Sequence, residues 1–141
     1  MIQDIIDTIA AALADTPGIK GEPAQYVGNL GELVKQPKRL PALWLIYDGA
    51  DFVGREVVDG VYAGHTMQFT VVLLAKNHRS RVDGAEACHT IIEAVRARLI
   101  GLLLSDYDAE LWPVSERLID ASGPLLVYAL SYQIKTSYSS S

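Results

Sequence analysis

The sequence contains a single cysteine, Cys88, among its 141 residues. One cysteine excludes an internal disulfide and is typical of a reducing compartment. No stretch approaches the roughly 18–20 consecutive apolar residues of a membrane-spanning helix. Asp4 and Asp7 interrupt the apolar residues at the start, and no basic leader precedes them, so we expect no signal peptide. The chain is therefore expected to be soluble and cytosolic when it is made.

The sequence also has little positive charge. It carries 12 lysines and arginines against 17 aspartates and glutamates, a net charge of −5. That balance argues against a dedicated nucleic-acid binder, which usually carries a basic patch. Half of the residues are hydrophobic and 21% are charged, as in ordinary globular proteins. We predict a single α+β domain at residues 1–136 and a flexible, serine-rich C-terminal tail at 137–141.

Recognisable catalytic and metal-binding motifs are lacking as well. The histidines have no second ligand at metal-binding spacing: His65, His78 and His89. Cys88 lies on the apolar stripe of a predicted helix, which favours packing over a nucleophilic role. Asp106 and Asp108 flank a tyrosine, a pattern more typical of solvated loop charges than of a catalytic pair. No nucleophile elbow or phosphate-binding loop occurs. We therefore predict no enzymatic activity, no cofactor and no metal.

The clearest pattern in the sequence is an apolar run at Met67–Asn77 followed by a helical pattern at Gly84–Leu104. In an extended strand both sets of alternate residues of the run are apolar enough to be buried, which indicates a central strand covered on both faces. The helical stretch repeats its apolar residues at steps of three and four. Asp83 and Glu86 have the spacing of a capping box. We predict a central strand with a long helix folded across its sheet.

The remaining elements are predicted from periodicity and from turn residues. We expect a helix over about residues 2–15, strands over 41–47, 110–114, 116–119 and 125–136, and a tight turn at Asp59–Gly60. Asp48-Gly49 is expected to close the strand that Pro41 begins. The long connection Asp48–Thr66 is predicted to be a hairpin arm. The element order predicts an α+β fold: a mostly antiparallel sheet, with two main helices packed on one face and a long hairpin arm.

A chain without a chemical site but with strands apolar on both faces suits a subunit that buries surface against copies of itself. Association of copies head to tail requires two different patches that meet. The arm and the closing strand supply the candidate interface residues: Phe52, Val57, Val58, Val61, Tyr62, Tyr128 and Tyr132.

The order and spacing of five segments resemble a known family, although each segment alone is nonspecific. The segments are MIQDIIDTIAAAL, LPALWLIYDG, QFTVVLLAKNHRS, DGAEACHTIIEAVRARLIGLLL and LLVYALSYQIKTSY. Together they resemble the tail terminator proteins of Mu-like phages and prophages. The resemblance implies a hexameric ring that caps the finished tail tube, ends tail polymerisation and offers a docking face to the head.

The same resemblance implies the partners and the location of the protein. The partners would be further copies of the chain, the tail tube protein and a head-completion or neck protein, with no membrane partner. DNA would pass through the lumen of the ring only as cargo. The protein would assemble in the host cytoplasm and remain in the tail of the virion.

Two other interpretations remain open. The first is another head–tail joining or neck subunit, which would share the ring but contact the portal side. The second is a small ligand-binding or enzymatic α+β domain. That interpretation requires a polar pocket with perturbed ionisable groups, and the sequence offers no cluster to line one.

Overall fold

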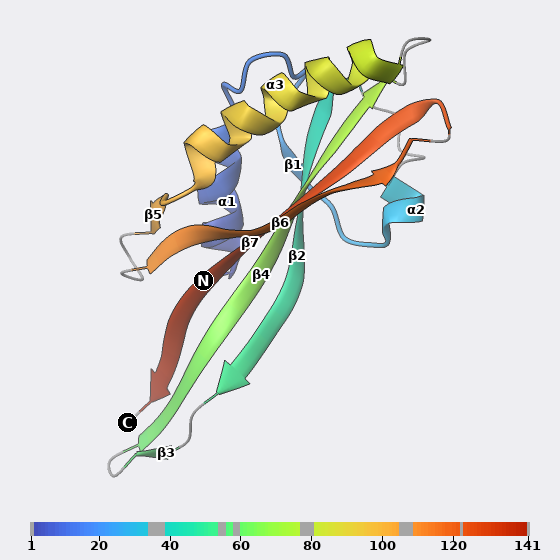
Figure 1. The fold of residues 1–141 in the computed structure, drawn as a ribbon. Coiled ribbons are helices and arrows are strands. Elements are labelled where there is room, and N and C mark those ends of the chain that lie inside the picture. Colours follow the sequence, from blue (N-terminus) through green and yellow to red (C-terminus); the bar gives the residue numbers. More distant parts are fainter. Residues whose placement is uncertain are drawn as a thin grey trace.

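The structure is a computed structural model and describes residues 2–33, 39–53, 56–57, 60–76, 81–104, 109–121 and 123–140. Helices and strands follow one another along these ranges (Figure 1). In chain order they are α1 (Ile2–Leu13), β1 (Ala24–Gln25), α2 (Leu30–Leu33), β2 (Ala42–Val53), β3 (Glu56–Val57), β4 (Gly60–Lys76), α3 (Arg81–Leu99), β5 (Leu103–Leu104), β6 (Ala109–Asp120) and β7 (Leu125–Ser140).

The strands form one sheet in the order β1-β2-β4-β7-β6-β5, and β3 pairs with β4 beside this path. Among the described residues, β1 and β2 pair in parallel, and the other strand pairs are antiparallel. This confirms the prediction of a mostly antiparallel sheet in an α+β fold. The long ladders β2–β4 and β4–β7 place β4 at the centre of the sheet, as its apolar run predicts.

The central strand β4 is buried on both faces. Val71 and Leu73 lie in the larger core cluster, together with the apolar residues of α1 and α3. Val72 and Leu74 point the other way and pack in a smaller cluster with Leu33 of α2. Because residues two apart in a strand share a face, this division follows from the alternation of the sequence.

Helix α1 contributes one stripe of side chains to the larger cluster. Its buried residues recur at helical spacing: Ile5, Ile6, Ile9 and Leu13. The helix ends where the hydroxyl of Thr16 donates to the carbonyl oxygen of Leu13 at 2.7 Å, and Pro17 follows. The predicted first helix is thus present and two residues shorter at its end.

Helix α3 is shorter than predicted. It begins at Arg81, before the predicted cap at Asp83, and it ends at Leu99 instead of Leu104. Gly101 stops it with a φ of 78°, a backbone conformation that glycine adopts without a steric cost. Leu103–Leu104 then form β5 against the start of β6. The apolar residues keep a helical spacing beyond Gly101, so the periodicity of the sequence placed the end of the helix too late.

Two strands are longer than predicted because each contains a bulge. The ladder of β2 with β4 shifts register between Tyr47 and Gly49, where Gly49 has a φ of 130°, and β2 then continues to Val53. The prediction that Asp48-Gly49 closes this strand is therefore wrong. The two short strands predicted around Ser115 are one strand, β6, whose register against β7 shifts between Pro113 and Ser115.

Strand β7 also continues beyond its predicted end. Residues predicted to form the flexible tail pair with β4 up to Val61↔Ser140. Ser137–Ser140 of the predicted tail thus belong to β7, and residue 141 lies outside the described part. Asp59 of the predicted tight turn also lies outside it, while Gly60 pairs with Val57.

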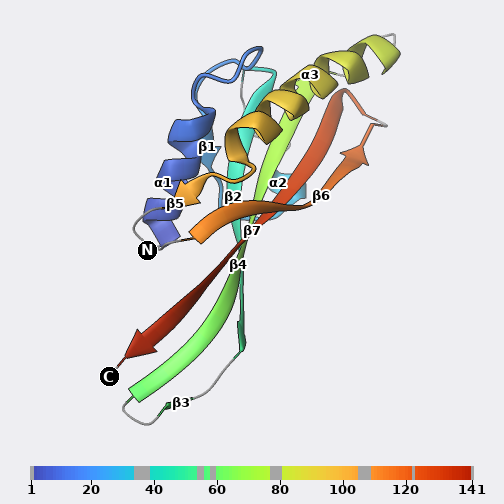
Figure 2. The ribbon, with the colours of Figure 1, turned by 60° about the vertical axis from the view of Figure 1, so that its left-hand side comes forward.

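The sheet is much longer than the helices that cover it. Figure 1 and Figure 2 show β2, β4 and β7 continuing past α1 and α3 toward β3 and the C-terminal end. In this extension β2 pairs with β4 up to Val53↔Gly64. The described residues of the predicted hairpin arm, Asp48–Thr66, belong to β2, β3 and β4, and β7 pairs with the other edge of β4.

Candidate interaction surface

The structure does not bring the predicted interface residues together. Phe52 lies in β2 near the far end of the extension, whereas Tyr128 and Tyr132 lie in β7 and pack in or against the larger core cluster. The backbones of three others belong to β3 and β4: Val57, Val61 and Tyr62. Their side chains and the whole of Val58 lie outside the described part.

Tyr132 is a core residue of the subunit. Its side chain is only 1% exposed, and it faces Phe69 across the β4–β7 ladder. Its hydroxyl is buried and has no hydrogen-bond partner among the described residues. Burial, with a smaller contribution from Glu116, raises the pKa of Tyr132 to about 12. Tyr132 therefore supports the fold, and no part of its ring is available to a partner.

Phe52 has the opposite character. Its side chain is 64% exposed, and it is one of the two phenylalanines in the chain. Its ring stacks on that of His65 with centroids 5.2 Å apart and planes inclined by 22°. His65 is itself buried and faces Phe52 across the β2–β4 ladder. One side of the Phe52 ring is thus supported, and much of the ring is open to solvent.

Among the side chains that the structure describes, the largest group of exposed apolar residues was not among the predicted interface residues. It lies in β6: Trp112, Val114, Leu118 and Ile119. Trp112 and Leu118 are each more than half exposed. A concentration of this kind on one element is typical of an interaction surface. The signal in the sequence was the apolar run around Pro113, but the bulges break the alternation from which a covered face is predicted.

A hollow of about 350 Å³ separates β6 from α3. Its apolar lining comes from both sides: Ile92 of α3, Leu118 of β6 and Tyr128 of β7. The charged residues that line it are Glu93, Arg96, Glu116 and Arg117, and His89 completes it. A second hollow of about 360 Å³ lies beside Trp112, between Glu110, Gln133 and Lys135. Strand β6 is thus flanked by two open hollows.

An ion pair fixes one wall of the first hollow. Nε of Arg96 donates to Oε2 of Glu116 at 2.8 Å, and the second guanidinium nitrogen, Nη2, pairs with Oε1 of the same carboxylate. This two-point contact holds α3 against β6 and raises the pKa of Arg96. The hollow is therefore a shaped recess with a fixed charged wall.

Among the described residues, no three His, Cys, Asp or Glu side chains gather into a group that could hold a metal ion. Cys88 is buried, and burial raises the pKa of its thiol, which is the opposite of nucleophile activation. His78, Asp106 and Asp108 lie outside the described part. No helix in the described ranges is long and apolar enough to cross a membrane.

Comparisons with known proteins agree with the fold. The family described as "Phage tail terminator protein" matches residues 2–140. A chain of the solved structure titled "Virion of native gene transfer agent (GTA) particle" has a similar fold, with a TM-score of 0.50 and 15% sequence identity. The match covers 92% of this chain and 84% of that chain. At this identity the likeness concerns the fold alone. No curated protein matches the chain.

Proposed function

The chain belongs to the phage tail terminator family, and we propose that it forms a ring that caps the tail tube, ends tail polymerisation and provides the docking face for the head. As a member of this family it is a structural component of phage tails. The observation that carries the proposal is the extent of the family match, which leaves only the terminal residues uncovered. We further propose a hexamer built in the host cytoplasm, with DNA passing through its lumen.

The distribution of apolar surface supports an assembling subunit. The chain exposes Phe52 at one edge of the sheet and the apolar side chains of β6 near the other edge. Two different patches on opposite edges are what a head-to-tail ring requires, whereas a two-fold dimer would use one patch twice. We propose that α1 and α3, packed on one face, leave both edges and the hairpin arm available to neighbouring subunits.

The other partners follow from the same proposal. A terminator contacts the tail tube protein on one side of its ring and a head-completion or neck protein on the other. The main alternative is a neck subunit that contacts the portal side instead. Affinity capture with the purified ring distinguishes the two, because a terminator should retain the tube protein and a neck subunit should retain the portal complex.

We propose that the protein acts through its geometry and has no enzymatic activity. The hollow beside α3 is open, and its charged wall is occupied by the Arg96–Glu116 pair. Replacing the buried Cys88 by alanine should therefore leave function intact wherever the variant folds. A well-folded variant that lost function would support the enzymatic alternative.

The decisive experiment removes the protein from cells that are producing particles. Without a terminator, tails of irregular or excess length should accumulate without heads, and electron microscopy measures both properties. Re-expression of the protein should restore uniform tails joined to capsids. Tails of normal length attached to heads in the absence of the protein would refute the proposal.

A further inference from the structure

We propose that Phe52 of one copy inserts into the hollow between α3 and β6 of the next copy, with Asp51 of the first copy facing Arg117 of the second. The proposal rests on the ring proposed above and identifies the two surfaces that meet in it. It concerns the hollow lined by Ile92, Leu118 and Tyr128, which the larger core cluster does not fill.

The first part of the argument is the position of Phe52. Strand β1 pairs with β2 only at Trp44 and Leu45, so in the described part of the chain the remainder of β2 forms an edge of the sheet. Phe52 lies on this edge and is largely exposed. Its stacking on His65 limits the rotation of the ring before any partner arrives. An ordered aromatic side chain loses little conformational entropy on binding, which suits an anchor residue.

The second part is the shape and chemistry of the recess. Its volume of about 350 Å³ exceeds that of a phenyl ring, and Ile92, Leu118 and Tyr128 from three elements give it an apolar part beside its charged residues. The Arg96–Glu116 pair joins the α3 side of the recess to the β6 side. A recess of this kind accepts an apolar side chain without a rearrangement of the subunit, since its walls are already in place.

The third part is the placement of charge. Asp51 is exposed and directly precedes Phe52, and Arg117 is exposed and directly precedes Leu118. The amide of Gln68 lies 3.5 Å from the Asp51 carboxylate, which leaves that carboxylate able to accept further bonds. When Phe52 enters the recess beside Leu118, the adjacent aspartate and arginine approach each other. The charges are therefore complementary, and they favour this orientation over the reverse.

The fourth part explains why side chains make the contact. Strand β5 pairs with β6 only at Ala109 and Glu110, so β6 presents a free edge from Trp112 onward within the described ranges. Pro113 has no backbone N–H, and the register shift that follows it bends the strand. These two features disfavour continuous strand pairing with a neighbour. The contact is therefore made by the exposed apolar side chains of β6, which the Phe52 ring of the neighbouring copy covers.

A cross-linking experiment tests the contact. Two variants are prepared, Asp51→Cys and Arg117→Cys, and each keeps Phe52 and the buried Cys88. Under mild oxidation a mixture of the two should form disulfide-linked dimers, while either variant alone should not. Val27→Cys is the matched control, because Val27 is 85% exposed and follows β1, which pairs with β2 at Trp44 and Leu45 and not at the Phe52 end. It should form no more cross-link with either partner than the unmodified protein does.

Every outcome of the mixture is informative. Cross-links restricted to the pair of different variants support the proposal. Self-linking of Arg117→Cys would overturn it, because that result indicates a two-fold contact. Rings visible by negative-stain electron microscopy without the cross-link would overturn this contact while the ring proposal stands. The cross-links can be specific while cells that lack the protein still make tails of normal length. That combination would uphold the contact and refute the terminator function.

Substitutions provide an independent measurement. Phe52→Asp should weaken self-association by about tenfold or more, as losses at aromatic anchors often do, while Val27→Asp should leave it unchanged. Sedimentation measures the assembly, and circular dichroism verifies that each variant is folded. Asp51→Arg and Arg117→Asp should each weaken assembly, and the double variant should recover it. Equal assembly by all of these folded variants would overturn the proposal.

Discussion

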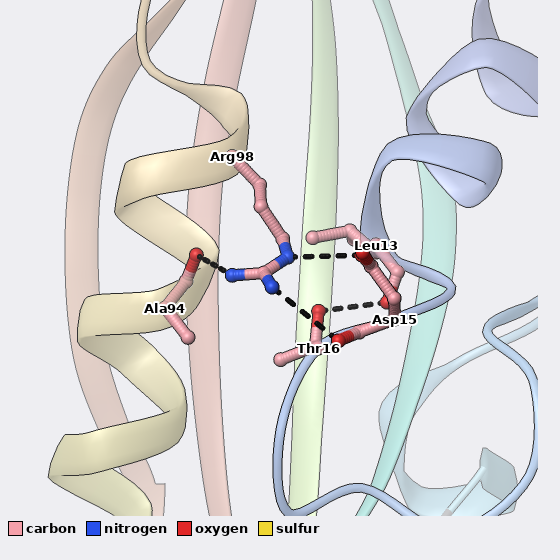
Figure 3. A network of polar contacts seen from close by, with 5 residues as sticks. All are labelled: Leu13, Asp15, Thr16, Ala94 and Arg98. Atoms are coloured by element: carbon pink, nitrogen blue, oxygen red, sulfur yellow. Dashed lines mark hydrogen bonds and ion pairs between the residues drawn. The ribbon is translucent and has the colours of Figure 1, made fainter.

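Arg98 of α3 and Asp15, which follows α1, lie 83 residues apart in the chain and are joined by two hydrogen bonds (Figure 3). Nε of Arg98 donates to Oδ1 of Asp15 at 3.2 Å, and its Nη2 donates to the backbone oxygen of the same residue at 3.3 Å. The third nitrogen donates to the carbonyl oxygen of Ala94 at 3.2 Å. One guanidinium thus ties the end of α1 to α3.

The backbone contact should contribute more to stability than the ion pair. The carboxylate of Asp15 is 85% exposed, and exposed ion pairs contribute little. We expect Asp15→Asn to change the free energy of unfolding by less than about 0.5 kcal/mol. Arg98→Ala should cost about 1–2 kcal/mol, because it also removes the donors to two backbone carbonyl oxygens. Urea denaturation measures both, and equal effects would contradict the assignment.

A second prediction concerns the thiol of Cys88. Burial raises its pKa, so the thiolate that reacts with alkylating reagents is scarce and inaccessible in the folded protein. We expect iodoacetamide to modify native Cys88 at pH 8 at least about a hundredfold more slowly than the same thiol in urea, because only the unfolded chain exposes it fully. Mass spectrometry follows the modification. Rapid labelling of the native protein would show that the α3 side of the core opens readily.

A third prediction follows from the buried hydroxyl of Tyr132. Its pKa is about 12 in the folded protein and near 10 when unfolded, so the folded state holds this proton more tightly. The resulting stability is fully present below pH 10 and is lost as the pH rises through 12. Tyr132→Phe removes the ionisable group and should flatten the decline of the unfolding free energy between pH 10 and 12. Thermal denaturation across this range measures the slope.

The same substitution should be neutral or stabilising at pH 7, because it removes a buried polar atom that has no partner among the described residues. Tyr132→Asp provides the contrast. It places a carboxylate in the core and should unfold the subunit, so a loss of assembly by this variant says nothing about an interface. A folded Tyr132→Asp subunit would contradict the burial of this side chain.

The sheet could be predicted from the sequence because its signal is local. The apolar run of β4 predicts a strand buried on both faces, and the structure covers Val71 and Val72 from opposite sides. The stripe of α1 likewise predicts which residues are buried. Element ends were less predictable, because Gly49 and Gly101 adopt positive φ angles with different consequences. Gly49 permits a bulge within strand β2, whereas Gly101 ends helix α3.

The interaction surface was harder to predict because it depends on which strands lie at the edges. The alternating pattern placed Tyr132 in a strand but could not decide whether its ring faced a helix or a neighbouring subunit. Trp112 and Leu118 are exposed because β5 pairs only with the start of β6, which leaves the rest of β6 at the edge of the described sheet. Strand order is a long-range property, and no motif in this chain encodes it.

The last prediction concerns the arm, Asp48–Thr66. Its strands continue past the helices, and among the arm side chains that the structure describes only His65 is buried, whereas Val71–Ala75 are all buried. Local opening should therefore be easier there. In a monomeric preparation we expect amide hydrogen exchange in the arm to be faster than in the centre of β4, and to slow upon assembly as a neighbour covers Phe52. Mass spectrometry of peptides from both states measures the difference. Equal protection in monomer and assembly would place the arm outside the subunit contact and would require the ring to use another surface.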